Sequence, residues 1–304
     1  MIVNALGLLR TWFRAASTWA RCLPNRAVMV TACLVLAQMA QAGPVSPLYL
    51  TTGSQVYVIQ GTGVVDSWPS GEQEYSIAVD TTVRTYSQGN PLLSLLGHEY
   101  GLDGTPTGAS YLNTVGCCFR DGTTDGMFNY AVRTGAVGAG IYRFDRNWSG
   151  PQLLPFLPGL IGGGTTGIAY DSSDDTFWVA EPSPTGNAIP VVHITRGGVQ
   201  LSAFSGGTGS GNVALAYDRA DDTLWLYVTT PNASELRQFS TSDAPGFKPP
   251  LSTMTGIGFV AGMEFALQRQ PSGIPEPTSL VLLCSGLVVI ATLRRFRRQA
   301  RNTD

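Results

Sequence analysis

Short apolar runs, separated by turns rich in Gly, Asp and Pro, fill most of this chain. Between positions 167 and 204, four such runs follow one another, at 167–171, 176–181, 190–195 and 199–204. Runs of five or six residues that are rich in β-branched and aromatic side chains are typical of strands. Because tight turns join the four runs, this region predicts a four-stranded antiparallel unit.

The first two strands of this unit recur 47 residues later. Residues 167–178 (GIAYDSSDDTFW) and 214–225 (ALAYDRADDTLW) are identical at seven of twelve positions. Weaker copies of the same start lie at 76–80, 116–119 and 262–265, so the five starts are 40, 51, 47 and 48 residues apart. A period of about 40 to 50 residues is typical of β-propellers, in which each repeat forms one blade.

The last repeat contains one strand, at 262–267, before the composition changes. The opposite end of the repeat region supplies three further strand-like runs, at 47–51, 55–60 and 64–68. A blade shared by both ends would close the ring and remove its exposed edges. We therefore predict an all-β fold, a β-propeller of four-stranded blades. Five blades are favoured, six are the alternative if 92–114 holds another blade, and a β-sandwich is the fallback.

The N-terminal segment has the three parts of a secretory signal. Four arginines lie within the first 26 residues, an apolar stretch spans 27–37, and Ala40-Gln41-Ala42 follows. About eleven apolar residues are too few to cross a hydrocarbon core of ~30 Å. We predict that residues 1–42 are a signal peptide for Sec-type export, cleaved between Ala42 and Gly43.

The C-terminal segment predicts a single membrane-spanning helix. Residues 278–293 contain no charged side chain. Sixteen helical residues reach about 24 Å, enough for a thin bilayer. A cluster of arginines follows and favours a cytoplasmic end by the positive-inside rule, which places the repeats outside; it consists of Arg294, Arg295, Arg297 and Arg298.

A Pro-Glu-Pro motif at Pro275, Glu276 and Pro277 comes directly before this helix. The order of motif, apolar helix and arginine cluster resembles the PEP-CTERM sorting signal of Gram-negative bacteria. The resemblance covers 274–298 and implies that exosortase, a membrane protease/transpeptidase, recognises the motif and delivers the protein to the cell surface or exopolysaccharide matrix. The chain then divides into a signal peptide (1–42), an extracytoplasmic propeller (43–273) and a sorting signal (274–304). A plain C-terminal anchor is the alternative.

Composition and charge fit an exported body. The chain has 36 Gly and 19 Pro, which argues against helical bundles. Between residues 43 and 273, ten Lys and Arg face nineteen Asp and Glu, a net charge of −9. An acidic surface disfavours nucleic acid as a partner. The repeats also loosely resemble bacterial NHL-like propellers, a resemblance that concerns the fold alone.

Clustered carboxylates after the repeated strands are the strongest candidate site in the body. Oxygen-rich loops suit Ca²⁺, although the spacing is not that of an EF-hand. Asp also forms hairpin turns through hydrogen bonds to its own backbone, and this turn chemistry is the favoured interpretation. Asp121 and Asp125 look like a related pair. The candidate cation-binding residues are Asp171, Asp174, Asp175, Asp218, Asp221 and Asp222.

Histidine and cysteine offer little for catalysis. The chain contains two histidines: His98, expected in a loop beside Glu99, and His193, expected on a strand facing solvent or a neighbouring blade. Neither belongs to a zinc-protease motif. We expect Cys117 and Cys118 to be thiols on opposite faces of a strand, because adjacent strand residues alternate. The sequence contains no nucleophile-elbow motif for a serine hydrolase.

Four tryptophans divide into two groups. Trp178 and Trp225 lie on the repeated strands and are expected to pack between blades. Trp68 at a strand end and Trp148 in a turn are candidates for stacking on sugars, but ordinary packing is favoured for them as well.

These observations favour an exported, non-catalytic propeller that binds matrix polysaccharide or protein. The rival is an extracellular propeller enzyme, a hydrolase or lyase acting on glycans or lactones, since propeller active sites leave little linear signature. A purely structural surface protein is the third alternative.

Overall fold

The computed structural model describes residues 44–267 except for 91, 93, 136–137, 156–165, 183–187, 231–232, 242–245, 248–249 and 257. Within these residues every regular element is a β-strand. None of the described residues forms a helix long and apolar enough to cross a membrane. The predicted signal peptide and sorting signal lie outside the described residues.

The largest sheet joins the two ends of the described chain. It has seven strands in the order β20 (Gly262–Phe265), β1 (Leu48–Thr51), β2 (Gly53–Gln60), β3 (Gly63–Val79), β4 (Thr82–Ser87), β5 (Leu96–Gly101) and β6 (Pro106–Leu112). β3 is long enough to serve two neighbours: its first part pairs with β2 and its last part with β4. The sheet therefore contains two sets of four antiparallel strands that share β3.

Three further sheets complete the described chain. One contains β7 (Phe119–Thr124), β8 (Phe128–Arg133), β9 (Gly140–Asp145) and β10 (Gln152–Leu153). The second contains β11 (Gly167–Asp171), β12 (Thr176–Ala180), β13 (Pro190–Thr195), β14 (Gln200–Ser205) and β18 (Gly246–Phe247). The third contains β15 (Ser210–Asp218), β16 (Thr223–Thr229), β17 (Ser234–Ser240) and β19 (Ser252–Thr255).

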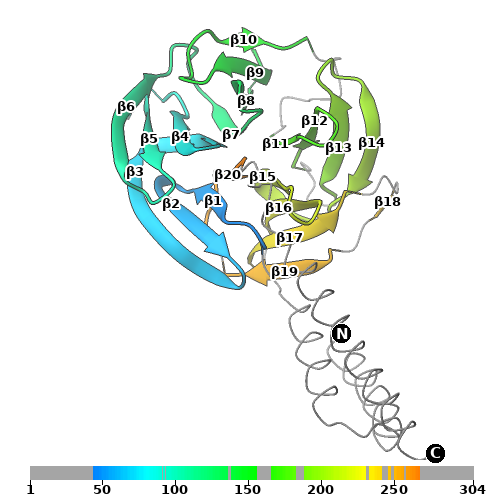
Figure 1. Ribbon diagram of the computed structural model, residues 1–304. Helices are drawn as coiled ribbons and strands as arrows, with labels where there is room; N and C mark the ends of the chain where they lie inside the picture. The colour runs from blue at the N-terminus through cyan, green and yellow to red at the C-terminus, as the bar shows by residue number, and fades with distance from the viewer. Residues whose placement is uncertain are drawn as a thin grey trace, which may run out of the picture. The chain divides into compact units, whose positions relative to one another are not determined.

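The fold is all-β, and its four-stranded antiparallel sheets resemble propeller blades. The sheets surround a centre at which β7, β11, β15 and β20 lie (Figure 1). The predicted pairing of the two ends is confirmed, because β1 pairs with β20 from Leu48 opposite Phe265 to Thr51 opposite Gly262. Residues 92–114 do not form a separate sheet; they supply β5 and β6 beside β4.

One predicted repeat start is wrong. The sequence pattern predicts the second start at 116, but β7 begins at Phe119, and Gly116 to Cys118 lie in the preceding loop. The positive φ of Gly116, 100°, turns the chain there. The spacing from Phe119 to the next start is therefore closer to that of the later repeats than the spacing from 116 is.

The apolar core lies between neighbouring sheets. Trp178 packs with Leu215 and Leu226 of the next sheet, and Trp225 packs with Leu48 and Leu50. Both tryptophans are buried, which confirms their predicted place between sheets.

The other two tryptophans are also core residues. Trp68 lies against Tyr49 and Tyr100, and Trp148 stacks on Tyr86 with ring centroids 4.8 Å apart. Both are buried, so packing and not sugar stacking explains them.

A single buried carboxylate ties the inner strands together. Asp121 lies within β7 and is fully buried, with each of its oxygens accepting two backbone N–H bonds. Oδ2 accepts from Leu215 at 2.7 Å and Ile168 at 3.1 Å, and Oδ1 accepts from Met263 at 2.9 Å and Gly122 at 3.0 Å. One side chain thus connects β7 to β15, β11 and β20.

Asp121 is therefore not the turn residue that its sequence pairing with Asp125 suggested. Asp125 does form a turn, accepting the N–H groups of Met127 and Phe128. Asp121 instead faces inward from the middle of a strand. Burial raises the pKa of Asp121 well above its ordinary value of 3.8, and the four N–H bonds oppose that rise.

Glu264 extends this network from β20. Its Oε2 accepts the N–H of Val79 at 2.6 Å, and its Oε1 accepts the N–H of Thr124 at 2.8 Å and the hydroxyl of Thr123. Glu264 is 5% exposed. Burial raises the pKa of Glu264 well above its ordinary value of 4.5, and the nearby Asp121 adds to the rise.

We predict that Asp121→Asn strongly destabilises the protein. The amide nitrogen would face two N–H groups that now have an acceptor, and each buried donor left unpaired costs about 1–3 kcal/mol. We expect the free energy of unfolding in urea to fall by about 2–5 kcal/mol. Asp66→Asn, at an exposed position, is the control and should stay within about 0.5 kcal/mol of the wild type. Equal stability of the two variants would contradict the role of Asp121.

Stability should also fall as the pH rises. Since the pKa of Glu264 is raised in the folded protein, the folded state keeps a proton that the unfolded state loses above pH 4.5. The slope is at most about 1.4 kcal/mol per pH unit for one group. Glu264→Gln should make the fall of the unfolding free energy from pH 4.5 upwards less steep, and the slope that remains is that of Asp121, whose pKa is also raised. Glu72→Gln, at an exposed position, is the control and should keep the slope of the wild type. A slope in Glu264→Gln equal to that of the wild type would refute this assignment.

Candidate functional site

The turn between β11 and β12 gathers three acidic side chains. Asp171, the last residue of β11, is 3% exposed and accepts hydrogen bonds from the backbone N–H and the hydroxyl of Ser173 at 2.9 and 2.7 Å. The turn closes at Asp175, whose φ of 63° lies in the left-handed region that Asp tolerates. The predicted turn chemistry of these residues is therefore present.

A histidine from another strand reaches the same turn. His193 on β13 lies directly opposite Trp178 on β12. The two rings stack with centroids 4.1 Å apart and an interplanar angle of 5°. His193 is 6% exposed, so of the two expected surroundings solvent is wrong. It shares a sheet face with Trp178, which packs against the neighbouring sheet. Its partner is a ring of its own sheet, because strand register places Trp178 beside it.

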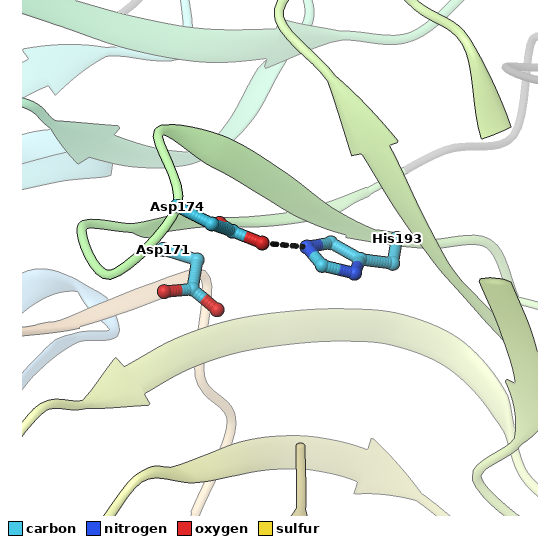
Figure 2. A group of neighbouring side chains, drawn as sticks. All are labelled: Asp171, Asp174 and His193. Atoms are coloured by element: carbon cyan, nitrogen blue, oxygen red, sulfur yellow. Dashed lines mark ion pairs between the residues drawn. The ribbon is translucent and has the colours of Figure 1, made fainter. Parts of the chain in front are cut away.

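The imidazole points toward the carboxylates (Figure 2). His193 Nε2 lies 2.6 Å from Thr176 Oγ1 and 3.5 Å from Asp174 Oδ2, while Thr176 Oγ1 also donates to Asp174 Oδ1. Asp171 Oδ2 accepts a bond of 3.2 Å from the indole N–H of Trp178. Trp178 therefore orients two members of the group, one by stacking and one by a hydrogen bond.

Asp171, Asp174 and His193 form a candidate metal centre. Each offers one ligand atom, and the three atoms lie within 4.8 Å of one another. Asp171 and His193 are buried, whereas the side chain of Asp174 is 45% exposed, so the group opens to solvent on the Asp174 side. Across the described ranges, no other group of three His, Cys, Asp or Glu side chains comes as close.

Asp175 does not join this group. Its Oδ1 accepts the hydroxyl of Tyr170 at 2.9 Å and Nε of Arg196 at 2.6 Å. Arg196 also binds Asp125 at 2.8 Å, which links the turn to the neighbouring sheet. Asp175 is thus part of an ion-pair network and not a third carboxylate of the metal centre.

The sister turn between β15 and β16 repeats the backbone but not the chemistry. Asp222 has a φ of 55°, close to that of Asp175, and its Oδ1 accepts the hydroxyl of Tyr217. Opposite Trp225, however, the chain has Gln238, whose Nε2 donates to Asp221 Oδ2 at 3.0 Å. The histidine of the first turn is replaced by an amide.

The two remaining carboxylates of the sister turn have different surroundings. Asp218 accepts the hydroxyl of Ser46 at 2.7 Å, from the segment before β1. Burial raises the pKa of Asp221 above that of an ordinary carboxyl. The structure thus brings together two of the six predicted aspartates, and the ligand that joins them, His193, was not among the predicted site residues.

His98 has a different partner from the one expected. It lies on β5 rather than in a loop, and its Nδ1 contacts the fully buried carboxylate of Glu74. Glu99 instead accepts the hydroxyl of Tyr111 at 2.7 Å. Alternation along the strand sends His98 and Glu99 to opposite faces, which rules out the expected acid/base pair.

Cys117 and Cys118 form a disulfide with each other. The prediction of two thiols on opposite strand faces is wrong, because both residues lie in the loop before β7, where strand alternation does not apply. The loop is held by Arg133 Nε, which donates to the carbonyl of Cys117 at 2.6 Å.

The remaining predicted residues lie outside the described part of the chain. They are the cleavage residues Ala40, Ala42 and Gly43, the sorting motif Pro275, Glu276 and Pro277, and the arginine cluster Arg294, Arg295, Arg297 and Arg298.

No protein-family model and no curated protein matches this chain. Among solved structures, it is similar to a chain of the nidogen/laminin complex (TM-score 0.47, 11% identity, 73% of this chain and 98% of that chain). It is also similar to a protein of unknown function from Bacteroides caccae (0.40, 9%, 73% and 99%). A third is the Kuenenia stuttgartiensis hydrazine synthase (0.42, 12%, 65% and 60%). The fold description rests on the strand pairing given above.

We predict that His193→Gln leaves the protein folded and nearly as stable as the wild type. Gln238 occupies the equivalent position of the sister turn and makes the same kind of hydrogen bond there. Urea unfolding should show that the free energy of unfolding falls by less than about 1.5 kcal/mol. His193→Leu, which leaves the turn without a donor, should cost more. A larger loss for Gln than for Leu would show that the two turns are not equivalent.

Proposed function

We propose that this protein is an exported five-bladed β-propeller, sorted to the cell surface or exopolysaccharide matrix, where it binds matrix polysaccharide or protein without catalysing a reaction. The observation that carries the proposal is the C-terminal order of Pro-Glu-Pro motif, uncharged segment and arginine cluster. This order implies exosortase as a partner, and the predicted signal peptide at 1–42 implies the Sec-type export machinery.

The strand pairing supports five blades. Each half of β3 completes a set of four strands in the seven-stranded sheet, and the other three sheets supply one set each. In the blade that holds β20, β1 and β2, both ends of the repeat region meet. Pairing of β1 with β20 leaves neither end of the repeat region as an incomplete blade, which suits a protein exposed outside the cell.

The first and last strands of the repeat region bring the two ends of that region together. Leu48, the first residue of β1, pairs with Phe265, the last residue of β20. The chain therefore enters β1 and leaves β20 at the same end of these two strands. Pro275 follows Leu267 by eight residues, which span at most about 29 Å when extended. Residues 268–274 are thus a short linker between the repeats and the motif.

The inner carboxylates favour binding over catalysis. An enzyme centred on the ring axis requires acidic groups that reach a substrate, and Asp121 and Glu264 do point inward. Their oxygens, however, accept bonds from the backbone of neighbouring strands, and both side chains are buried. They tie strands together and offer a substrate no free face.

The enzyme alternative, a hydrolase or lyase on glycans or lactones, keeps one supporting observation. Asp171, Asp174 and His193 bring carboxylates and an imidazole together at a partly open turn. Incubation of the purified protein with matrix polysaccharide separates the two functions. Saturable binding without shortened chains supports the binding protein, and release of oligosaccharides supports the enzyme.

We predict that the matrix form of the protein begins near Gly43 and ends between Pro275 and Pro277. Terminal peptides from membrane and matrix fractions of the native host, identified by mass spectrometry, test this. Glu276→Ala should keep the wild-type unfolding midpoint, because the motif lies outside the repeats, but should stay in the membrane with its tail intact. A wild-type protein found only in the membrane and ending beyond Arg298 would indicate a plain anchor.

A further inference from the structure

We propose that Asp171, Asp174 and His193 bind one divalent transition-metal ion, with Zn²⁺ as the representative of the class. This inference does not depend on the proposed sorting or on polysaccharide binding. The acidic turns by themselves suggest Ca²⁺, whereas this inference names a metal that takes a nitrogen ligand. It concerns the turn between β11 and β12 and not the sister turn.

The donor set selects the metal class. Ca²⁺ sites in proteins are built from six to eight oxygen ligands, whereas Zn²⁺ and similar ions bind imidazole nitrogen together with carboxylate oxygen in sets of three or four. Here the imidazole nitrogen Nε2 faces Asp174 Oδ2 at 3.5 Å, a separation close to that between two ligands of one small ion. The half-exposed side of Asp174 leaves room for a water as the fourth ligand.

Surrounding contacts hold the three ligands in place. The stacked ring of Trp178 restricts rotation of His193, and its indole N–H binds Asp171 Oδ2. The backbone and hydroxyl of Ser173 fix the other oxygen of Asp171. Partners of this kind orient ligands and support affinity in known metal sites.

The charge of the cluster favours a cation. The cluster contains two carboxyl groups, and two of its three side chains are buried. The nearby Arg196 binds Asp175 and Asp125, and neither ligand carboxylate. Tyr217 of the next sheet faces Asp171 and adds no positive charge. When a metal binds at Nε2, the ring proton must be on Nδ1, so the metal bond would replace the hydrogen bond between His193 Nε2 and Thr176 Oγ1.

The sister turn provides an internal comparison. It has aspartates at both equivalent positions, but Gln238 replaces the histidine and donates an N–H toward Asp221. The amide nitrogen of Gln238 therefore lies where a metal ligand would have to offer a lone pair. An amide N–H is a donor and has no lone pair to give to a metal. The sister turn should therefore bind no transition metal, and its residues supply matched control variants.

The test uses the full-length chain in detergent, stripped of metal with a chelator. Isothermal titration with ZnCl₂ should show one bound equivalent for the wild type. His193→Gln and Asp174→Asn should each weaken binding at least tenfold, while Gln238→Ala and Asp221→Asn should bind as the wild type does. Titration with CaCl₂ under the same conditions should give the same result for the wild type and for His193→Gln, with no saturable site that requires His193.

Two further readouts protect the test from misfolding and from adventitious binding. Urea unfolding without metal should show that His193→Gln is folded, and Co²⁺ added to the wild type should give visible absorption bands that this variant lacks. Absence of Zn²⁺ binding by the folded wild type, equal binding by His193→Gln, or a saturable Ca²⁺ site that requires His193 would each overturn the proposal.

Discussion

The carboxylate of Asp121 is the constraint on which the rest of the structure depends. Inner strands of neighbouring sheets present N–H groups that have no strand partner on the inner side, and buried N–H groups without acceptors are costly. Asp121 accepts four of them, from β7, β11, β15 and β20. Glu264 accepts three further donors, from β3 and β7. Within a sheet, backbone hydrogen bonds join neighbouring strands. Between the sheets, these two acidic side chains take that role and hold the separate sheets around one centre.

This arrangement links the fold to the order of the chain. β20 contributes Met263 and Glu264 to the centre, yet it is the last strand of the described residues. The centre is therefore incomplete until residues 262–265 pair with β1, some 200 residues earlier in sequence. Pairing over such a distance is slow because loop-closure entropy opposes it.

Most of the strands could be predicted from the sequence, and most of the side-chain partnerships could not. Periodic apolar runs and the 47-residue repeat located β11 to β14 within a residue or two, because strand formation depends on local alternation and turn residues. The role of Asp121 depends on three strands far away in sequence, so no local pattern marks it. His193 meets Trp178 because of the β12–β13 register, and His98 meets Glu74 across two strands. The one available signal was the difference between the repeats: the position opposite the repeated tryptophan is His193 in one and Gln238 in the next.

Hydrogen exchange of individual backbone amides, followed by NMR, tests the central claim most directly. If Asp121 ties the inner strands together, the amides of Ile168, Leu215 and Met263 should exchange at one common rate, set by global unfolding, because opening any of them breaks the same centre. Rapid exchange at Met263 while Ile168 and Leu215 stay protected would contradict the account, since it would show that β20 leaves the ring independently and that the carboxylate does not close it.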